Sequence, residues 1–264
     1  DTLAKAIVAE MNRLHASGSG LSEHTSLTAV NAVSSSAAAL TAAGLAFTPV
    51  SGTFKVYVHN ATGAVASSVT VTVTAGVTTL EDVRAALDAD PNLAATITGG
   101  KLTVTTAAGT TFAFAADTSD ALMALGLNTF FTGTDARTIA VNPVVSSDAA
   151  KIAAAKADAG GLVHQGDGAN ALALAQLRTK LAMNGSTSTF GDFYGAAVGR
   201  VGSLARDATQ ALERQQASVQ LVRGLQQQTS GVSTDEELIS LSESQTAYAA
   251  AAKFATTIND IIET

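Results

Sequence analysis

The chain contains no cysteine, no tryptophan and only 3 proline residues among its 264 residues. Without cysteine it can form no disulfide scaffold, no thiolate nucleophile, no cysteine-based zinc site and no iron–sulfur centre. Charged residues are also scarce, at 14% against about 25% in typical soluble proteins. The net charge of -7 has the wrong sign for a protein that follows the phosphate backbone, so we expect no nucleic-acid partner.

Long apolar runs are absent as well. No run approaches the roughly 18 residues of a membrane span, so the sequence predicts no membrane insertion. The lack of cysteine does not fix a compartment, because secreted and cytosolic proteins can both do without disulfides. The chain begins at Asp1, immediately before a helical pattern, so we expect a fragment of a longer protein.

Residues 1–48 are predicted to form a helix over 2–16 and a connecting segment with weak periodicity. From residue 49 to 143 the pattern changes to that of a small β-rich outer domain. Phe54, Val56 and Val58 alternate with other side chains, and the valines from 69 to 73 alternate with threonines, which predicts a hairpin of half-buried strands. The further elements expected here are a helix capped by Thr79, strands at 95–98, 101–105 and 111–115, and a short helix at 119–125.

Residues 144–264 are predicted to be helical, so the fold class is α+β. We expect a short helix over 148–157, a second after Asp167, and a long third helix over about 192–228. The last helix begins at Ser233, where Ser233 and Glu236 form a capping-box pattern. Because only a short turn separates the two long helices, they are predicted to form an antiparallel, coiled-coil-like hairpin.

Both long helices carry apolar residues at alternating spacings of four and three, and the last helix has a second apolar stripe beside the first. A face wider than one partner helix can cover implies a second partner. That partner is either a segment preceding Asp1 or other subunits, and both can hold at once. The residues expected to pack in assembly are Val201, Leu204, Val222, Leu225, Leu238, Leu241, Tyr248, Phe254, Ile258 and Ile261.

No arrangement of residues predicts catalysis, a cofactor or a metal. The four histidines (His15, His24, His59 and His164) are far apart in sequence and are expected to be solvated surface or loop residues. The glycine-rich stretch 160–168 lacks the Lys-Ser/Thr of a phosphate-binding loop, which favours a flexible interhelical loop. The acidic cluster at 235–237 suits the positive end of a helix dipole without any substrate. We therefore expect no enzyme.

Several ordered blocks resemble the flagellar hook-associated protein 1 family, which joins the hook to the filament. The resemblance is strongest over roughly the last 75 residues and weakest between 22 and 49, and it covers most of the chain. The blocks in the last 75 residues are 192–194, 198–202, 215–217, 230–237, 245–248 and 258–260. Those elsewhere are 11–15, 126–135, 139–143 and 170–177. Two departures are the absence of the family's N-terminal helical segment and the serines at 240, 242 and 244 where the family has larger apolar residues.

The resemblance implies a structural protein exported by the flagellar secretion system to the extracellular flagellum. The implied partners are the hook protein, the second hook–filament junction protein, copies of itself and a flagellar export chaperone. The helices from 192 to 262 would form a flagellin- or hook-type inner core, and the sheet module would face outward. Two alternatives remain: another flagellar axial protein, such as a flagellin or the second junction protein, and a secreted adhesion or binding module.

Overall fold

The computed structural model describes residues 1–164 and 166–263. It divides the chain into two units, Asp1–Ala197 and Val198–Thr264, with the boundary inside helix α6. The helices are α1 (Thr2–Ala16), α2 (Leu80–Asp88), α3 (Ala121–Leu125), α4 (Pro143–Ser147), α5 (Ala169–Gln176), α6 (Phe190–Ser230) and α7 (Thr234–Ile262). The strands are β1 (Ser26–Thr28), β2 (Gly52–Asn60), β3 (Val65–Val73), β4 (Leu93–Thr98), β5 (Lys101–Thr106), β6 (Thr110–Ala115), β7 (Phe131–Thr132) and β8 (Ala140–Val141). Two 3-10 turns are η1 (Leu40–Ala42) and η2 (Ala149–Lys151).

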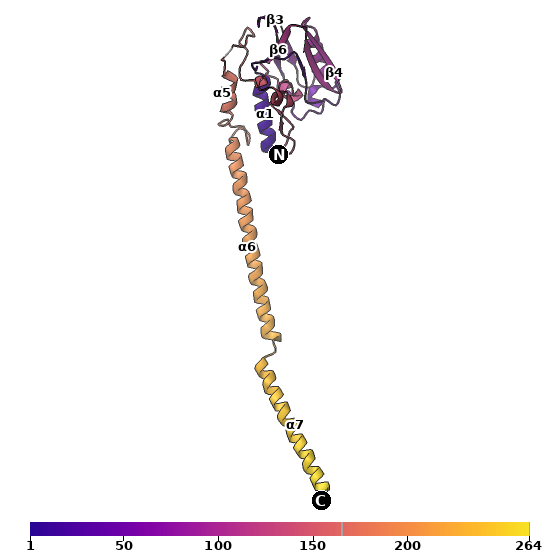
Figure 1. Cartoon of the computed structure of the whole chain (residues 1–264), viewed down its shortest axis with the longest axis vertical. Helices are drawn as coiled ribbons and strands as arrows, with labels where there is room; N and C mark the ends of the chain where they lie inside the picture. Colours follow the sequence, from indigo (N-terminus) through magenta and orange to yellow (C-terminus); the bar gives the residue numbers. More distant parts are fainter. Residues whose placement is uncertain (165, 264) are drawn as a thin grey trace. The chain divides into compact units, whose positions relative to one another are not determined.

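Two antiparallel sheets of three strands lie in the first unit (Figure 1). One has the strand order β3–β2–β6 and the other β1–β5–β4. In the first sheet, β2 pairs with β3 from Gly52 opposite Val73 onward, and the register shifts between Val58 and His59. The β-hairpin predicted from residue 54 to 73 and the mixed α+β class are therefore confirmed.

The core of this unit comes from the alternating pattern of the strands. Phe54, Val56 and Val58 are fully buried on one face of β2. On β6, Phe112 and Phe114 are also fully buried, and their ring centroids lie 5.4 Å apart in an edge-on arrangement. Fully burying one such side chain contributes about 1.5–3 kcal/mol relative to leaving it in water. This row of side chains therefore accounts for much of what holds the sheets together.

Helix α2 covers the core from outside the sheets and buries Leu80, Val83 and Leu87. Thr79 caps it as predicted. The backbone N–H of Asp82 donates to the Thr79 hydroxyl at 3.1 Å, and the backbone N–H of Thr79 donates to the Asp82 carboxylate at 2.8 Å. This reciprocal pair fixes where the helix begins, because it satisfies two backbone donors that the first turn leaves free.

The segment after α1, predicted only as a connection, contributes the short strand β1 to one of the sheets. Ser26 lies opposite Thr105 on β5, and the only helical piece between α1 and residue 49 is the 3-10 turn η1. Four of its large apolar residues are nonetheless buried, namely Leu27, Val33, Leu40 and Phe47, whereas Leu21 is 85% exposed. Their spacing matches neither a helix nor a strand, because each fits a different gap in the core.

Helix α3 ends at Gly126, as predicted. Gly126 has φ +75°, and a Cβ at this position would lie 2.8 Å from the Cβ of Val30. Only glycine suits both the left-handed conformation and the close approach of the neighbouring chain.

The helix predicted over 148–157 is wrong. Asp148 does accept a hydrogen bond from the backbone N–H of Ala150, but only the 3-10 turn η2 follows. Beyond it, Ala155 exchanges backbone hydrogen bonds with Ser19 at 2.9 and 3.0 Å. This bridge pulls the chain out of helical geometry. The helix predicted after Asp167 is α5: Asp167 accepts from the N–H of Ala169 at its start, and the helix ends at Gln176.

Candidate functional site

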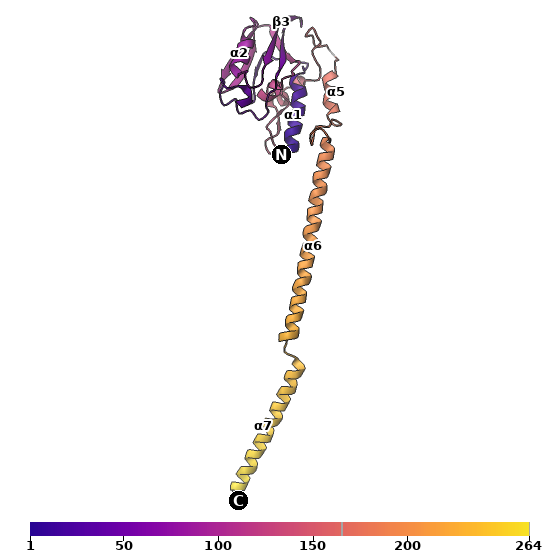
Figure 2. The ribbon, with the colours of Figure 1, turned by 180° about the vertical axis from the view of Figure 1, so that it is seen from behind.

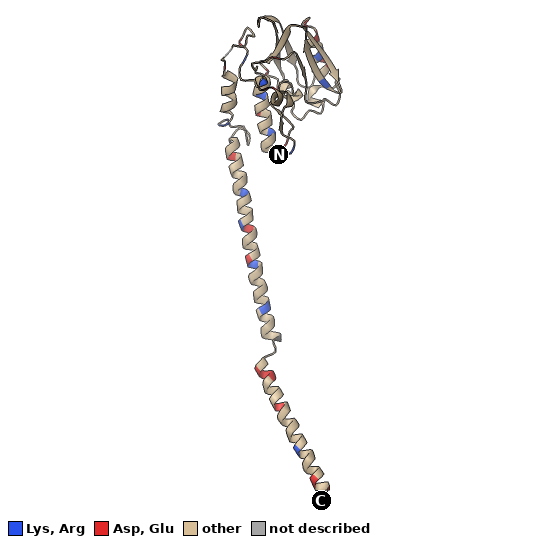
Figure 3. Cartoon of the chain, viewed as in Figure 1, with Lys and Arg blue, Asp and Glu red and all other residues tan. Residues whose placement is uncertain are grey.

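The ten residues predicted to mediate assembly lie on α6 and α7, and the structure leaves all of them exposed. Their exposed fractions range from 41% at Ile258 to 79% at Tyr248. Figure 3 shows that charged side chains are scattered along these two helices, with long uncharged stretches between them. The exposed set is Val201, Leu204, Val222, Leu225, Leu238, Leu241, Tyr248, Phe254, Ile258 and Ile261. Each of these residues is thus free in the single chain to contact another helix.

Three further exposed apolar residues widen the stripe on α6. Val198, Leu212 and Val219 are 53%, 58% and 41% exposed. They come directly after residues 197, 211 and 218, which belong to the same four-three repeat as Val201 and Leu204 and which we call the seam together with them. All three share one position of the heptad, beside this seam. This repeat is visible in the sequence, so the wider face could have been predicted from it.

The structure does not confirm the hairpin predicted for α6 and α7. A hairpin would bury the α6 stripe against the α7 stripe, yet Val201, Leu225 and Leu241 are all more than half exposed. The packing of these two stripes against each other, and the coiled coil they would form, therefore stay predictions.

Both long helices begin with a side-chain cap. At α6, Thr189 accepts from the N–H of Asp192, and the Asp192 carboxylate accepts from the N–H and hydroxyl of Thr189. These bonds from Thr189 lower the pKa of Asp192. At α7, the predicted cap Ser233 accepts from the N–H of Glu236 at 3.3 Å. The acidic residues 235–237 lie in this first turn, where their carboxylates interact favourably with the positive end of the helix dipole.

A second cluster of functional interest is buried around the end of α1, and we call it the α1 junction: Asn12, His15, Asn128 and Asn170. The Asn128 side-chain amide donates to the carbonyls of His15, Ala16 and Gly18 at 2.9–3.3 Å. It thereby caps the C-terminus of α1, whose last carbonyls have no partner inside the helix. Asn128 itself has φ +50°, a conformation that asparagine tolerates better than most residues.

The other asparagines of the junction also bond to backbone. Asn12 donates to the carbonyl of Phe131 at 2.9 Å and accepts from its N–H at 2.8 Å. Asn170 donates to the carbonyls of Leu14 and Ala153 at 3.1 and 2.7 Å. The segments 11–15, 126–135 and 170–177, which are distant in sequence, therefore meet at one place.

His15 occupies the centre of the junction and is fully buried. The N–H of Ala153 donates to its Nε2 at 3.0 Å, which assigns the ring proton to Nδ1. Nδ1 then donates to the carbonyl of Asn128 at 2.8 Å. Burial lowers the pKa of His15, so the imidazole is neutral and joins two separate loops to α1.

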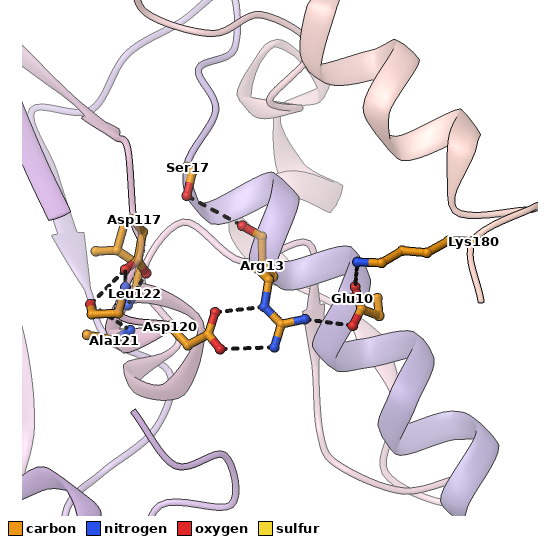
Figure 4. Close-up of polar contacts among 9 residues, drawn as sticks. Glu10, Arg13, Ser17, Asp117, Asp120, Ala121, Leu122 and Lys180 are labelled. Carbon is orange, nitrogen blue, oxygen red and sulfur yellow. Dashed lines mark hydrogen bonds and ion pairs between the residues drawn. The ribbon is translucent and has the colours of Figure 1, made fainter. Parts of the chain in front are cut away.

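An ion-pair network anchors the same helix on its outer side (Figure 4). Arg13 donates to both carboxylate oxygens of Asp120 at 2.7 and 3.0 Å, and to Glu10 at 2.6 Å. Lys180 donates to the other oxygen of Glu10 at 2.6 Å. The bond to Asp120 raises the pKa of Arg13 further. The network connects α1 to α3 and to the segment that leads toward α6.

The expectation of solvated histidines is wrong for three of the four. His15, His24 and His59 are 0%, 7% and 3% exposed. His24 donates through Nε2 to the Asn128 side-chain oxygen at 3.2 Å, and burial lowers its pKa. His164 is exposed, as expected, and pairs with Asp158 at 2.9 Å. Sequence spacing could not have shown this burial, because each ring is enclosed by segments distant in the chain.

His59 joins the glycine-rich loop to the sheet. Its Nδ1 lies 2.9 Å from the Glu23 carboxylate and its Nε2 lies 2.9 Å from the carbonyl of Gly161. Both neighbours are acceptors, so the protonated ring suits the site, and the hydrogen bond with Glu23 raises the pKa of His59. A Cβ at Gly161 would lie 2.2 Å from the Tyr57 ring. The described part of this loop is thus held against β2 and is not a free connection.

Among the described residues, no group of three or more histidine, aspartate or glutamate side chains could hold a metal ion. The half-buried carboxylate of Asp117 serves the fold, because it accepts hydrogen bonds from Ser119 and from the N–H of Leu122 at the start of α3. Within the described part of the chain, no helix is long and apolar enough to cross a membrane.

Comparison with known proteins confirms the resemblance stated from the sequence. The chain is similar to flagellar hook-associated protein 1 of Bacillus subtilis (strain 168), with 32% identity over 98 residues. That match covers 37% of this chain and 19% of the relative, so the chain spans about a fifth of the relative's length. Residues 226–264 match the family described as flagellar basal body rod FlgEFG protein C-terminal. The family match contains the end of α6 and all of α7.

Proposed function

We propose that this chain is a structural component of the bacterial flagellum that joins the hook to the filament. The observation that carries the proposal is the exposed apolar face of α6 and α7, which lies partly in the segment similar to flagellar rod proteins. The similarity to a hook-associated protein supports placing the chain at the junction between hook and filament. The chain acts by assembly, without covalent chemistry.

Assembly proceeds through the apolar stripes of the two long helices. Phe254, Ile258 and Ile261 are 67%, 41% and 69% exposed in the single chain. Removing such side chains from water stabilises a complex by about 25 cal/mol per Å² of apolar area. The helices pair with each other, with a segment preceding Asp1 or with neighbouring subunits, and this seam forms the inner layer. The regions 1–48, 49–143 and 144–264 are an N-terminal helix with its connection, an outer domain and the helical part.

The partners in this proposal are the hook protein, the second junction protein, further copies of the chain and an export chaperone. The chain is exported by the flagellar secretion system and functions outside the cell. A second candidate place is elsewhere on the flagellar axis, because the family that matches residues 226–264 is described for rod proteins.

Deletion of residues 233–264 tests the proposal. In cells whose own copy of the gene carries the deletion, we expect hooks without filaments by electron microscopy, and the shortened chain in the medium. Lys101→Asp, at an exposed position on β5, is the control and should leave filaments unchanged. Normal filaments on the hooks of the deletion strain would contradict the proposal.

A further inference from the structure

The sheet β3–β2–β6 has one open edge, the strand β3. It is nine residues long, and no other strand of the described chain pairs with it on the side away from β2. No hydrogen bond joins its backbone to any described residue on that side. Figure 2 shows β3 at the top of the first unit. A row of backbone donors and acceptors is therefore available along it.

Each of the other long edges of the two sheets has at least one position where another segment bonds to the outer backbone groups. The edge of β6 exchanges two backbone hydrogen bonds with His24, at 2.7 and 3.1 Å. At the edge of β4, the Asp88 carboxylate accepts from the N–H of Ala95 at 3.1 Å. The remaining edge strand, β1, is only three residues long. The open edge of β3 is thus an exception within this unit.

The strand β3 also lacks most of the usual protection of an edge: the register shift leaves Ala66 without a partner near the start of the strand, and the pairing is regular from Ser67 to Val73. Proteins commonly guard edge strands with charged residues, proline or bulges that discourage pairing with another chain. Val65–Val73 reads VASSVTVTV and contains no charged residue, no proline and no glycine. The β-branched residues favour strand geometry, so the edge is ready to accept another strand.

We propose that β3 pairs edge to edge with β3 of a second copy of this chain. The strand is self-complementary: in an antiparallel pair centred on Val69, Ser68 of each copy lies opposite Thr70 of the other. These exposed side chains are small, and hydroxyl pairs across strands are favourable. The absence of charge removes the repulsion that two identical charged edges would have. One pair of nine-residue strands makes a small interface, so the contact is weak between two free chains and gains strength where many copies stand close together.

Cysteine pairs test the register directly, because the chain has no cysteine of its own. In the full chain carrying Ser68→Cys and Thr70→Cys, the thiol at position 68 of one copy lies opposite the thiol at position 70 of the other. Mild oxidation should give a covalent dimer. The matched control is Thr96→Cys with Thr98→Cys, two exposed positions with the same spacing on β4, an edge strand on which Asp88 accepts from the N–H of Ala95. We expect several-fold less dimer from this control, and equal yields would overturn the proposal.

Charge variants test the same contact without a covalent bond. Ser68→Lys with Thr70→Lys sets like charges opposite each other at two places, and should weaken association by about tenfold in sedimentation velocity. Ser68→Lys with Thr70→Glu sets opposite charges there and should restore it. Association through α6 and α7 is the same in both variants, so any difference between them comes from β3. Identical sedimentation of the two variants would overturn the proposal.

Discussion

His15 and His59 are both buried, yet their surroundings act on them in opposite directions. His15 receives a hydrogen bond at Nε2 and donates one at Nδ1, so its site suits the neutral ring, and burial lowers its pKa. His59 faces two acceptors, so its site suits the charged ring, and the bond with Glu23 raises its pKa. The two residues therefore give opposite contributions to the pH dependence of stability.

His15→Gln should lower the free energy of unfolding by about 2–3 kcal/mol at pH 7, because buried polar partners lose their bonds. The folded-state pKa of His15 lies below its ordinary value of 6.5, so its contribution is complete above that pH. It is lost as the pH falls from there through the folded-state pKa. Urea denaturation across pH 4–8 measures this, and the difference between wild type and variant should shrink on acidification. A difference that stays constant would argue against the neutral buried ring.

His59→Gln should show the opposite trend. The folded-state pKa of His59 lies above 6.5, so the charged ring contributes fully below that pH and its contribution is lost as the pH rises through the folded-state value. We expect a loss of about 1.5–3 kcal/mol at pH 6 and a smaller loss in alkaline buffer. The same urea series checks it. If the loss grew with pH, the assigned hydrogen bonds to Glu23 and Gly161 would be wrong.

At the scale of elements, α1 is held by side chains from distant segments. Asn128 caps its last turn, Asn170 and His15 attach it to neighbouring loops, and Arg13 pairs with Asp120. A helix of this length has little stability alone and depends on such contacts. The junction therefore decides whether α1 stays docked.

Two variants at Asn128 separate the cap from the backbone conformation. Asn128→Ala removes the amide and also places an alanine at a φ of +50°, which is strained. Together these two effects should lower the free energy of unfolding by more than about 2 kcal/mol. Asn128→Gly relieves the strain but still lacks the amide, so it should recover only about 1 kcal/mol of that loss. Thermal and urea unfolding give the values. Full recovery by glycine would show that the amide does not matter.

Regular elements could be predicted from the sequence where the pattern is local. The β2–β3 hairpin, the capped α2 and the long helices α6 and α7 follow from periodicity and from capping residues such as Thr79 and Ser233. Elements set by distant contacts could not. Ala155 is drawn away from a helix by Ser19, and Leu27 is drawn into a strand by Val104, and neither pairing leaves a trace in the local sequence.

The same division holds for the candidate site. The apolar stripes on α6 and α7 follow a repeat, so their residues could be named in advance, and Leu212 could have been added by the same repeat. The α1 junction could not be predicted as a site, because its hydrogen bonds connect residues more than 100 positions apart in most cases. The resemblance marked these blocks individually, and only the structure brings them together.

At the scale of the whole molecule, the two units differ in how they use their apolar residues. The first unit has a complete core and internal polar networks, whereas the helices of the second expose their apolar stripes. A low content of charge is consistent with helices that bury most of their surface in an assembly. We therefore hold that these stripes form the contacts on which assembly depends.

The most direct test compares an aspartate introduced within the apolar stripe of α7 with an aspartate introduced outside that stripe. Leu241→Asp puts a carboxylate into the seam, which should cost several kcal/mol once the seam is buried and leave hooks bare in electron micrographs. Thr246→Asp lies on the polar side of α7 with Asp235 and Lys253, and should leave the fraction of hooks that carry filaments unchanged. Bare hooks in the first strain and normal filaments in the second are the predicted result. Normal filaments in both strains would contradict assembly through these stripes.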